Sequence, residues 1–149
     1  MQIGIGKYIA KRMLAGFIDY GAYFAAFVGY CRMFGEPNTA GDYEVHGCSH
    51  VLFLFALWIV LLPLPEMIWG RGIGKWFVDL HVARAADFES PPGALAVAKR
   101  QVMSFIEIGM CFGVLAVIVI LSTERRQRLG DLWAQTLVID RDQPLPSGS

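Results

Sequence analysis

The sequence predicts an all-α membrane protein with three hydrophobic helical segments and a small β-strand pair at the membrane surface. The composition is 55% hydrophobic and only 17% charged, which is more apolar than a soluble average. Three nearly uncharged stretches, 13–31, 51–69 and 101–122, each approach the roughly 20 residues that span a hydrocarbon core of ~30 Å. As core helices of a soluble protein they would leave too little of the 149 residues to cover them. We therefore predict one membrane domain over residues 1–140 and a flexible tail over 141–149.

The prediction of strands and turns rests on local patterns between these segments. Pro63 and Pro65 each remove a backbone donor, so we expect a kink or an early end of the second helix there. A glycine-rich turn over 69–75 follows. Apolar and polar residues then alternate over 76–82, and the run 136–139 is similarly strand-like. Neither strand is stable alone, so we expect the two to pair on one side of the membrane.

The distribution of basic residues predicts the orientation. Positive charge concentrates on the cytoplasmic side of inner-membrane proteins, which places the N-terminus in the cytoplasm. If the third segment enters and returns, twelve of the 13 lysines and arginines are cytoplasmic and only Arg32 is outside. If it crosses fully, the basic residues after it also lie outside. The strand pair and the charge count favour both termini inside, whereas the apolar run 113–121 favours a crossing.

An internal repeat links the first and third segments. The stretch 10–19 aligns with 98–107, so that Arg12 matches Arg100 and Asp19 matches Glu107. The alternative is coincidence within a restricted alphabet of membrane residues. Each helix also carries small residues at four-residue spacing, which favours close helix contact within one chain or between copies. These residues are Gly21, Ala25 and Gly29 in the first helix, and Gly109 and Gly113 in the third.

One polar loop contains residues of metal-ligand type. His46, Cys48 and His50 would share one face of an extended strand, and Cys31 closes the same loop. Sulfur with imidazole would suit zinc or copper. The alternatives are a Cys31–Cys48 disulfide, if the loop faces an oxidising space, and unpaired thiols.

Three motifs carry a resemblance to a known family. They are Lys-Arg-Met-Leu-Ala-Gly-Phe-Ile-Asp at 11–19, Gly-Arg-Gly-Ile-Gly-Lys at 70–75, and Arg-Gln-Arg-Leu-Gly-Asp-Leu-Trp-Ala-Gln-Thr-Leu-Val at 126–138. Together they resemble the RDD family of bacterial membrane proteins, whose name records one arginine and two aspartates. The match places these at Arg12, Asp19 and Asp131, and it departs at Gln135, where the family more often has glycine. The resemblance implies a multi-pass protein of the bacterial inner membrane with a role in transport.

Charged residues inside the hydrophobic segments need ion-pair or hydrogen-bond partners. Asp19 lies about two turns inside the first helix, where an unpaired charge costs at least ~2.5–3.5 kcal/mol. Arg12 is on the same face and Asp131 closes the cluster, with Arg128 three residues before it. The cluster is then either a salt-bridge clasp that fixes helix packing or a relay for protons or cations.

Two further acids extend this cluster. Glu66 follows the two prolines, where free carbonyls and a carboxylate could converge on an ion, as in broken-helix transporters. The alternative is an interfacial acid at the helix end. Glu107 is deeper in its segment and is predicted to pair with Arg100.

Two classes of function remain. No nucleophile and base are suitably placed, so we expect neither an enzyme nor a cofactor, and the net charge of zero gives no reason for a nucleic-acid partner. The first class is transport of a proton, a sodium ion or a small solute by a homo-oligomer in the lipid bilayer, since three segments cannot enclose a path alone. The second is an accessory or assembly subunit of a larger membrane complex.

Overall fold

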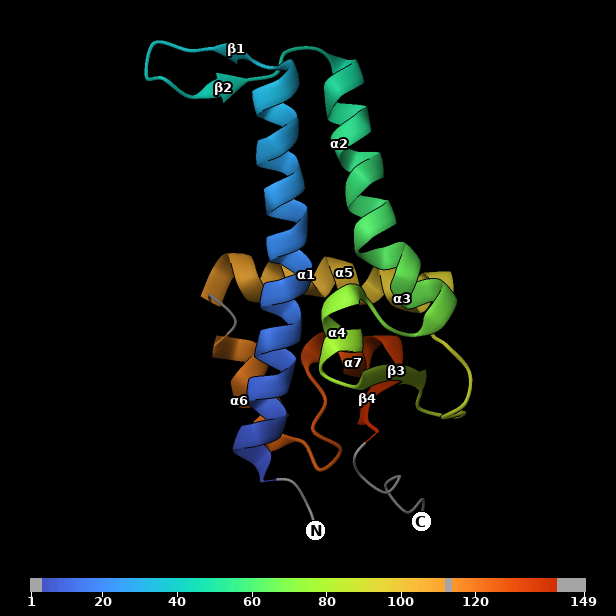
Figure 1. The fold of residues 1–149 in the computed structure, drawn as a ribbon. Helices are drawn as coiled ribbons and strands as arrows, with labels where there is room; N and C mark the ends of the chain where they lie inside the picture. The colour runs from blue at the N-terminus through green and yellow to red at the C-terminus, as the bar shows by residue number, and fades with distance from the viewer. Residues whose placement is uncertain (1–3, 112–113, 142–149) are drawn as a thin grey trace.

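A computed structural model describes residues 4–111 and 114–141 (Figure 1). Helix α1 (Ile5–Phe34) packs against α2 (Cys48–Leu61), and a hairpin of β1 (Glu36–Pro37) and β2 (Tyr43–Glu44) lies in the connection between them. Helix α3 (Pro63–Trp69) follows α2. The remaining elements gather at the other end of α1: α4 (Ile73–Phe77), β3 (Leu80–Arg84), α5 (Ala94–Cys111), α6 (Val114–Ser122), α7 (Leu129–Ala134) and β4 (Thr136–Asp140).

Two helices of the described residues are long and apolar enough to cross a membrane, α1 and the run Cys48–Trp69. Only 17% of the most apolar window of each is buried, so their surfaces are available to lipid. The third predicted segment is not among them: it covers parts of α5 and α6, and residues 112–113 within it lie outside the described residues. Figure 1 shows α5 running crosswise to α1 and α2. The described part of the chain thus has two candidate spans, where three hydrophobic segments were predicted.

The predicted break at the prolines is confirmed. Helix α2 ends at Leu61 and α3 begins at Pro63, the first helical position, where proline costs no hydrogen bond. Helix α3 ends at Gly70, whose φ of 68° is left-handed. A side chain there would collide with His81 and with the carbonyl of Val82. Glycine therefore lets the chain fold back on itself, and Val82 N donates to Gly70 O at 2.6 Å.

The predicted strand pair is also confirmed, with a corrected start. Strands β3 and β4 are antiparallel, and Val82 lies opposite Val138. Trp76 and Phe77, which were predicted to be in the strand, belong to α4 instead. This short helix packs directly on α1, because Gly74 has no Cβ to collide with the Ala15 carbonyl. Packing against α1 therefore overrides the alternating pattern of the sequence.

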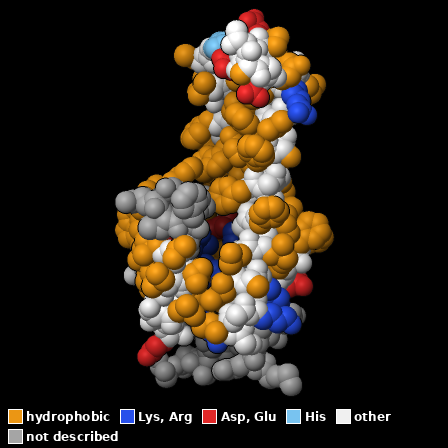
Figure 2. Space-filling model, turned by 90° about the vertical axis from the view of Figure 1, so that its left-hand side faces the viewer, with side chains coloured by type: hydrophobic (Ala, Val, Ile, Leu, Met, Phe, Trp, Pro, Cys, Tyr) orange, Lys and Arg blue, Asp and Glu red, His pale blue; other side chains and the backbone are white. Residues whose placement is uncertain are grey.

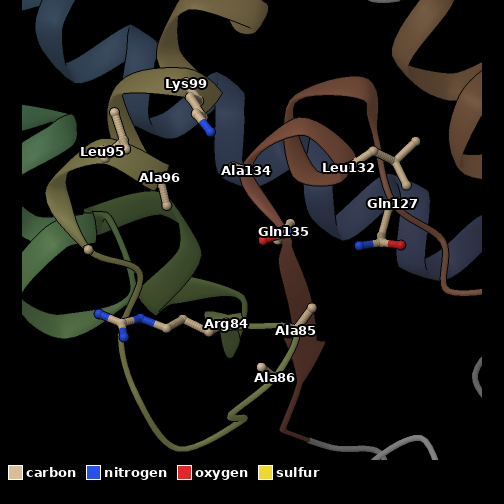
Figure 3. A pocket seen from close by; sticks show the side chains of 11 residues that line it. Arg84, Ala85, Ala86, Leu95, Ala96, Lys99, Gln127, Leu132, Ala134 and Gln135 are labelled. Atoms are coloured by element: carbon tan, nitrogen blue, oxygen red, sulfur yellow. The ribbon is translucent and has the colours of Figure 1, made fainter.

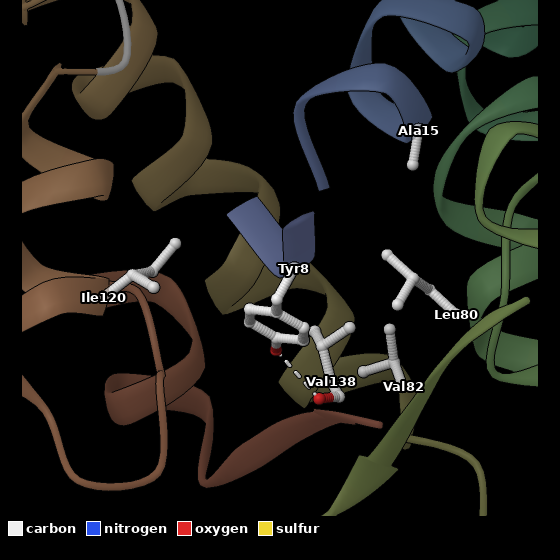
Figure 4. Packing of buried hydrophobic residues seen from close by; sticks show 6 residues of the cluster. All are labelled: Tyr8, Ala15, Leu80, Val82, Ile120 and Val138. Atoms are coloured by element: carbon white, nitrogen blue, oxygen red, sulfur yellow. Dashed lines mark hydrogen bonds between the residues drawn. The ribbon is translucent and has the colours of Figure 1, made fainter. Parts of the chain in front are cut away.

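A small core fixes the strand pair to the start of α1. Figure 4 shows its six buried residues, which come from α1, β3, α6 and β4: Tyr8, Ala15, Leu80, Val82, Ile120 and Val138. The Tyr8 hydroxyl donates to Val138 O at 2.9 Å, and Lys11 Nζ lies 3.0 Å from Asp140 Oδ2. The start of α1 and strand β4 therefore lie at one end of the molecule, and the β1–β2 hairpin lies at the other (Figure 1).

This arrangement predicts which residues share a side of the membrane. With one crossing each by α1 and by Cys48–Trp69, the exposed Lys7 and Glu124 lie on the same side, and the exposed Cys48 lies on the opposite side. We expect Lys7→Cys and Glu124→Cys, each as the only cysteine, to respond alike to a membrane-impermeant thiol reagent on intact cells. Cys48 as the only cysteine should respond in the opposite way. Labelling of one introduced cysteine without the other would contradict two crossings.

Candidate functional site

Asp131 is the centre of a buried charge cluster. It is the third residue of α7, fully buried, and its Oδ2 accepts from the backbone N of Arg128 at 3.1 Å, the reach-back that favours an acid at this position. Arg12 Nη2 on α1 donates to the same oxygen at 2.6 Å. Arg100 Nη1 on α5 donates to Oδ1. One carboxylate thus joins three helices.

Arg100 extends the cluster toward the second span. It is 1% exposed, and its Nε donates to Glu66 Oε1 of α3 at 2.6 Å. Its Nη1 also donates to Thr136 Oγ1 of β4 at 2.9 Å. The other oxygen of Glu66 accepts from Lys75 Nζ at 2.5 Å. Arg100 on α5 is therefore joined to α3, α7 and β4 by charge-assisted hydrogen bonds, which are stronger than neutral ones.

Asp19 is separate from the arginines. Its Oδ1 accepts from the backbone N of Gly74 at 2.7 Å, and both carboxylate oxygens face Gly72, at the start of α4. The predicted pairing of Arg12 with Asp19 is not what the structure shows, because Arg12 bonds Asp131, the Tyr8 hydroxyl and the backbone of the 123–128 turn.

The cluster contains equal numbers of acids and bases around a small cavity. The cavity has a volume of about 70 Å³, room for about two waters, and its lining includes Arg12, Asp19, Glu66, Lys75, Arg100 and Arg128. Three buried polar atoms of its lining residues have no hydrogen-bond partner in the structure, Arg100 Nη2, Gln101 Oε1 and Arg128 Nε, and neither does Glu107 Oε1 of the cluster. In Figure 2 blue and red side chains lie at the bottom of a hollow between hydrophobic surfaces. The site is therefore polar inside and apolar outside.

The electrostatics keep Asp131 ionised. Burial alone would raise its pKa, but Arg100, then Arg12 and Arg128, outweigh burial and hold the pKa of Asp131 well below its ordinary value. For Arg100, burial would lower the pKa, and Asp131 and Glu66 reverse that effect and raise it. Both groups keep their charges at any physiological pH.

Two predicted environments need correction. Glu66, predicted either as an ion ligand beside free carbonyls or as an interfacial acid at the helix end, is 2% exposed and bonded to Arg100 and Lys75, neither of which was predicted as its partner. Glu107 does not pair with Arg100. Its Oε2 lies 4.0 Å from Arg128 Nη1, because Arg100 turns to Glu66 and Asp131 on its other side. In both cases the sequence identified the acid and missed its partner.

The small-residue stripe of α1 has no partner among the residues that the structure describes. Gly21, Ala25 and Gly29 are exposed, and nothing lies within 4 Å of where a Cβ of either glycine would be. Gly109 lies in α5, but its surroundings, like Gly113 itself, fall outside the described residues. The structure therefore gives no contact between the two predicted stripes.

The metal prediction is wrong for the described residues. They contain no group of three or more histidines, cysteines or acids able to hold an ion. Cys48 begins α2, so His46, Cys48 and His50 do not form the extended strand that would have aligned them. His50 Nδ1 instead lies 2.8 Å from the Tyr30 hydroxyl. Cys31 is buried, Cys48 is exposed, and both are free thiols.

Two members of the site, Lys75 and Thr136, were not predicted from the sequence. Lys75 ends the glycine-rich turn 69–75, which also contains Arg71, so nothing in the sequence distinguished it as an ion-pair partner. Thr136 is fully buried at the start of β4 and carried no signal beyond its strand propensity. The internal repeat, by contrast, has a structural counterpart, since the aligned Arg12 and Arg100 each bond one oxygen of Asp131.

Two apolar helices open to lipid and a buried cluster of paired charges define a small membrane protein. The chain belongs to the RDD family, whose model matches residues 8–135. No curated protein and no solved structure matches it.

The cluster predicts unequal costs of substitution. Asp131→Ala leaves Arg12 and Arg100 buried without their shared acceptor, and we expect it to lower stability by about 3–5 kcal/mol. Asp19→Asn keeps an oxygen for Gly74 N, so its cost should be about 1 kcal/mol or less. Thermal unfolding in detergent measures both, with the exposed Glu124→Gln as control. Equal losses for the two aspartate variants would contradict this assignment.

The lowered pKa of Asp131 predicts the pH dependence of stability. Its folded pKa lies below the unfolded value of about 3.9, so its contribution is complete above roughly pH 5 and is lost as pH falls toward the folded pKa. We expect the difference in Tm between wild type and Asp131→Asn to be constant from pH 7 to 5 and to shrink below pH 4. A difference that stays constant down to pH 3 would show that Asp131 is not the group responsible.

Proposed function

We propose that the chain acts as a homo-oligomer that moves a proton, a sodium ion or a small solute across the membrane, with Asp19 as the carboxylate that changes charge. The observation that carries this proposal is the placement of Asp19. It lines the 70 Å³ cavity, is 8% exposed, and makes its one hydrogen bond to a neutral backbone amide. Among the described residues it has no ion pair.

The other acids of the cluster differ from Asp19 in this respect. Asp131 is bonded by two arginines, and Glu66 by Arg100 and Lys75. Neutralising either acid would leave a buried cation unpaired, at a cost of several kcal/mol. Asp19 can take up a proton or a cation without breaking an ion pair. We therefore assign Asp131 and Glu66 to a fixed frame, and Asp19 to the exchange.

An oligomer supplies what one chain lacks. Two spanning helices cannot enclose a path, and the exposed stripe Gly21, Ala25 and Gly29 on α1 is suited to close packing against a second copy. Such packing would bring the α1 helices of two copies together, and further spanning helices of the oligomer would then enclose a path.

We propose the bacterial inner membrane as the location, with the N-terminus in the cytoplasm and no enzymatic activity. With two crossings, Arg32 lies at the end of α1 beside the β1–β2 hairpin, apart from the other basic residues. Positive charge concentrates on the cytoplasmic side. In the labelling experiment above, we then expect Cys48 to react with the reagent from outside the cell, and Lys7→Cys and Glu124→Cys not to react.

Flux through reconstituted vesicles tests the proposal. Asn keeps the shape of Asp19 and its bond to Gly74 N but carries no charge, so Asp19→Asn should abolish ion flux while Tm and oligomer mass stay near wild type. Glu124→Gln, on the exposed surface, should retain full flux. Wild-type vesicles without flux under any proton or sodium gradient would overturn the transport role.

A second function is favoured by the balance of the cluster. Its four bases and four acids sum to zero, as expected of a clasp that only holds helices together: Arg12, Lys75, Arg100 and Arg128 against Asp19, Glu66, Glu107 and Asp131. The chain would then be an accessory or assembly subunit that docks its α1 stripe on a larger complex. Native mass in mild detergent separates the two, since a homo-oligomer supports transport and stable association with a larger assembly supports the accessory role.

A further inference from the structure

A larger groove lies apart from the charge cluster. It has a volume of about 640 Å³, in the range of ligand sites, and shares no lining residue with the cavity around Asp19. Figure 3 shows it between the end of β3, the start of α5 and the α7–β4 segment. Eleven residues line it: Arg84, Ala85, Ala86, Gly93, Leu95, Ala96, Lys99, Gln127, Leu132, Ala134 and Gln135.

The charges of this groove are all positive. Arg84 and Lys99 are its only charged residues. Neither side chain forms a hydrogen bond or a salt bridge with any residue that the structure describes, while Arg84 interacts electrostatically with the exposed Asp87 and Lys99 Nζ lies over the Trp133 ring. The Arg84 guanidinium lies at the start of α5, where a Cβ on Gly93 would be 3.3 Å from its Nη2. The nearby Asp87 is itself engaged by Ser90 and by a backbone amide. Two cations thus face the groove with no acid among its lining residues.

Apart from Gln127 and Gln135, the rest of the groove lining is apolar, and the groove borders the exposed Trp133. Leu95 is 71% exposed and Leu132 is 43% exposed. Trp133, which follows Leu132, is half exposed, and Lys99 Nζ lies 5.6 Å from the centre of its ring. Exposed tryptophans concentrate at the level of lipid headgroups. The groove therefore combines positive charge with apolar side chains open to the surroundings.

We propose that this groove binds the phosphate of an anionic phospholipid, with Arg84 and Lys99 as its cationic partners and Leu95 and Leu132 against the first acyl carbons. Basic residues near a membrane surface each contribute to the attraction of anionic lipid. A soluble phosphate would use the two cations and leave the exposed leucines without a role. The inference does not depend on transport.

Gln135 adds a polar contact and a useful variant. Its φ of 53° lies in the left-handed region, where glycine is favoured over residues with a side chain. Its amide nevertheless lines the groove, where it can donate to a phosphate oxygen. Gln135→Gly should therefore relieve backbone strain and weaken lipid binding in the same protein. A loss of binding in this variant cannot be ascribed to misfolding.

Native mass spectrometry of the full chain in mild detergent, titrated with phosphatidylglycerol or phosphatidylcholine, tests the proposal. We expect saturable binding of phosphatidylglycerol only. Arg84→Gln and Lys99→Gln should each weaken it about fivefold and the double variant more than tenfold. The matched control is Lys7→Gln with Arg125→Gln, which removes two exposed charges outside the groove and should leave affinity within twofold. Gln135→Gly should bind more weakly than wild type, with Tm equal or higher.

Three results would overturn the proposal. The first is an equal loss of affinity in the control double variant, which would mean that net charge alone attracts the lipid. The second is unchanged binding in the Arg84→Gln, Lys99→Gln double variant. The third is full displacement of the lipid by inorganic phosphate at an equal concentration, which would assign the groove to a soluble anion.

Discussion

The carboxylate of Asp131 joins the two halves of the chain. Arg12 reaches it from the first helix and Arg100 from the fifth. Without Asp131, Arg12 would lose its ion pair and Arg100 would keep only that with Glu66. Removing ions from water costs more than their attraction returns unless the hydrogen bonding is nearly complete. The cluster is therefore favourable only when α1, α5 and α7 are all in place. Thr136 of β4 is bonded to Arg100, so the position of β4 and its register with β3 also depend on the cluster.

The sequence predicted the elements better than the partners. Hydropathy, the two prolines and the alternating runs are local signals, and they located both spans, the break before Pro63 and the antiparallel strands. Which acid meets which base is not local, since Arg100 and Glu66 are 34 residues apart. The predicted Arg12–Asp19 pair failed for this reason, because periodicity shows a shared helix face and says nothing of a carboxylate on another helix. The metal prediction failed because the backbone around Cys48 is helical.

The structure gives a physical account of two sequence features: the internal repeat, and the glutamine at position 135 where the family more often has glycine. Arg12 and Arg100 align in sequence and take opposite oxygens of one carboxylate, while their aligned acids diverge, Asp19 toward α4 and Glu107 toward Arg128. Gln135 ends α7 in a left-handed conformation that explains why glycine suits the position. A glutamine there carries a backbone cost of order 1 kcal/mol. That cost is consistent with a role for its amide in the groove that it lines.

The position of the charge cluster along α1 explains how a protein that crosses a membrane can contain so many charged residues. This helix has 30 residues, about 45 Å, which exceeds the ~30 Å hydrocarbon core. Counting about 20 residues back from Phe34 reaches Ala15. Asp19 then lies roughly one turn inside the hydrocarbon boundary, and Arg12 lies outside it. Charge costs less there than at the centre of a bilayer, because water and snorkelling side chains reach this depth. At this boundary Asp131 and Glu66 are held in ion pairs, whereas Asp19 forms no salt bridge with any described residue and interacts electrostatically with Lys75, which lines the same cavity. A fixed set of ion pairs beside one such carboxylate is what either a proton relay or a one-sided sodium site would require.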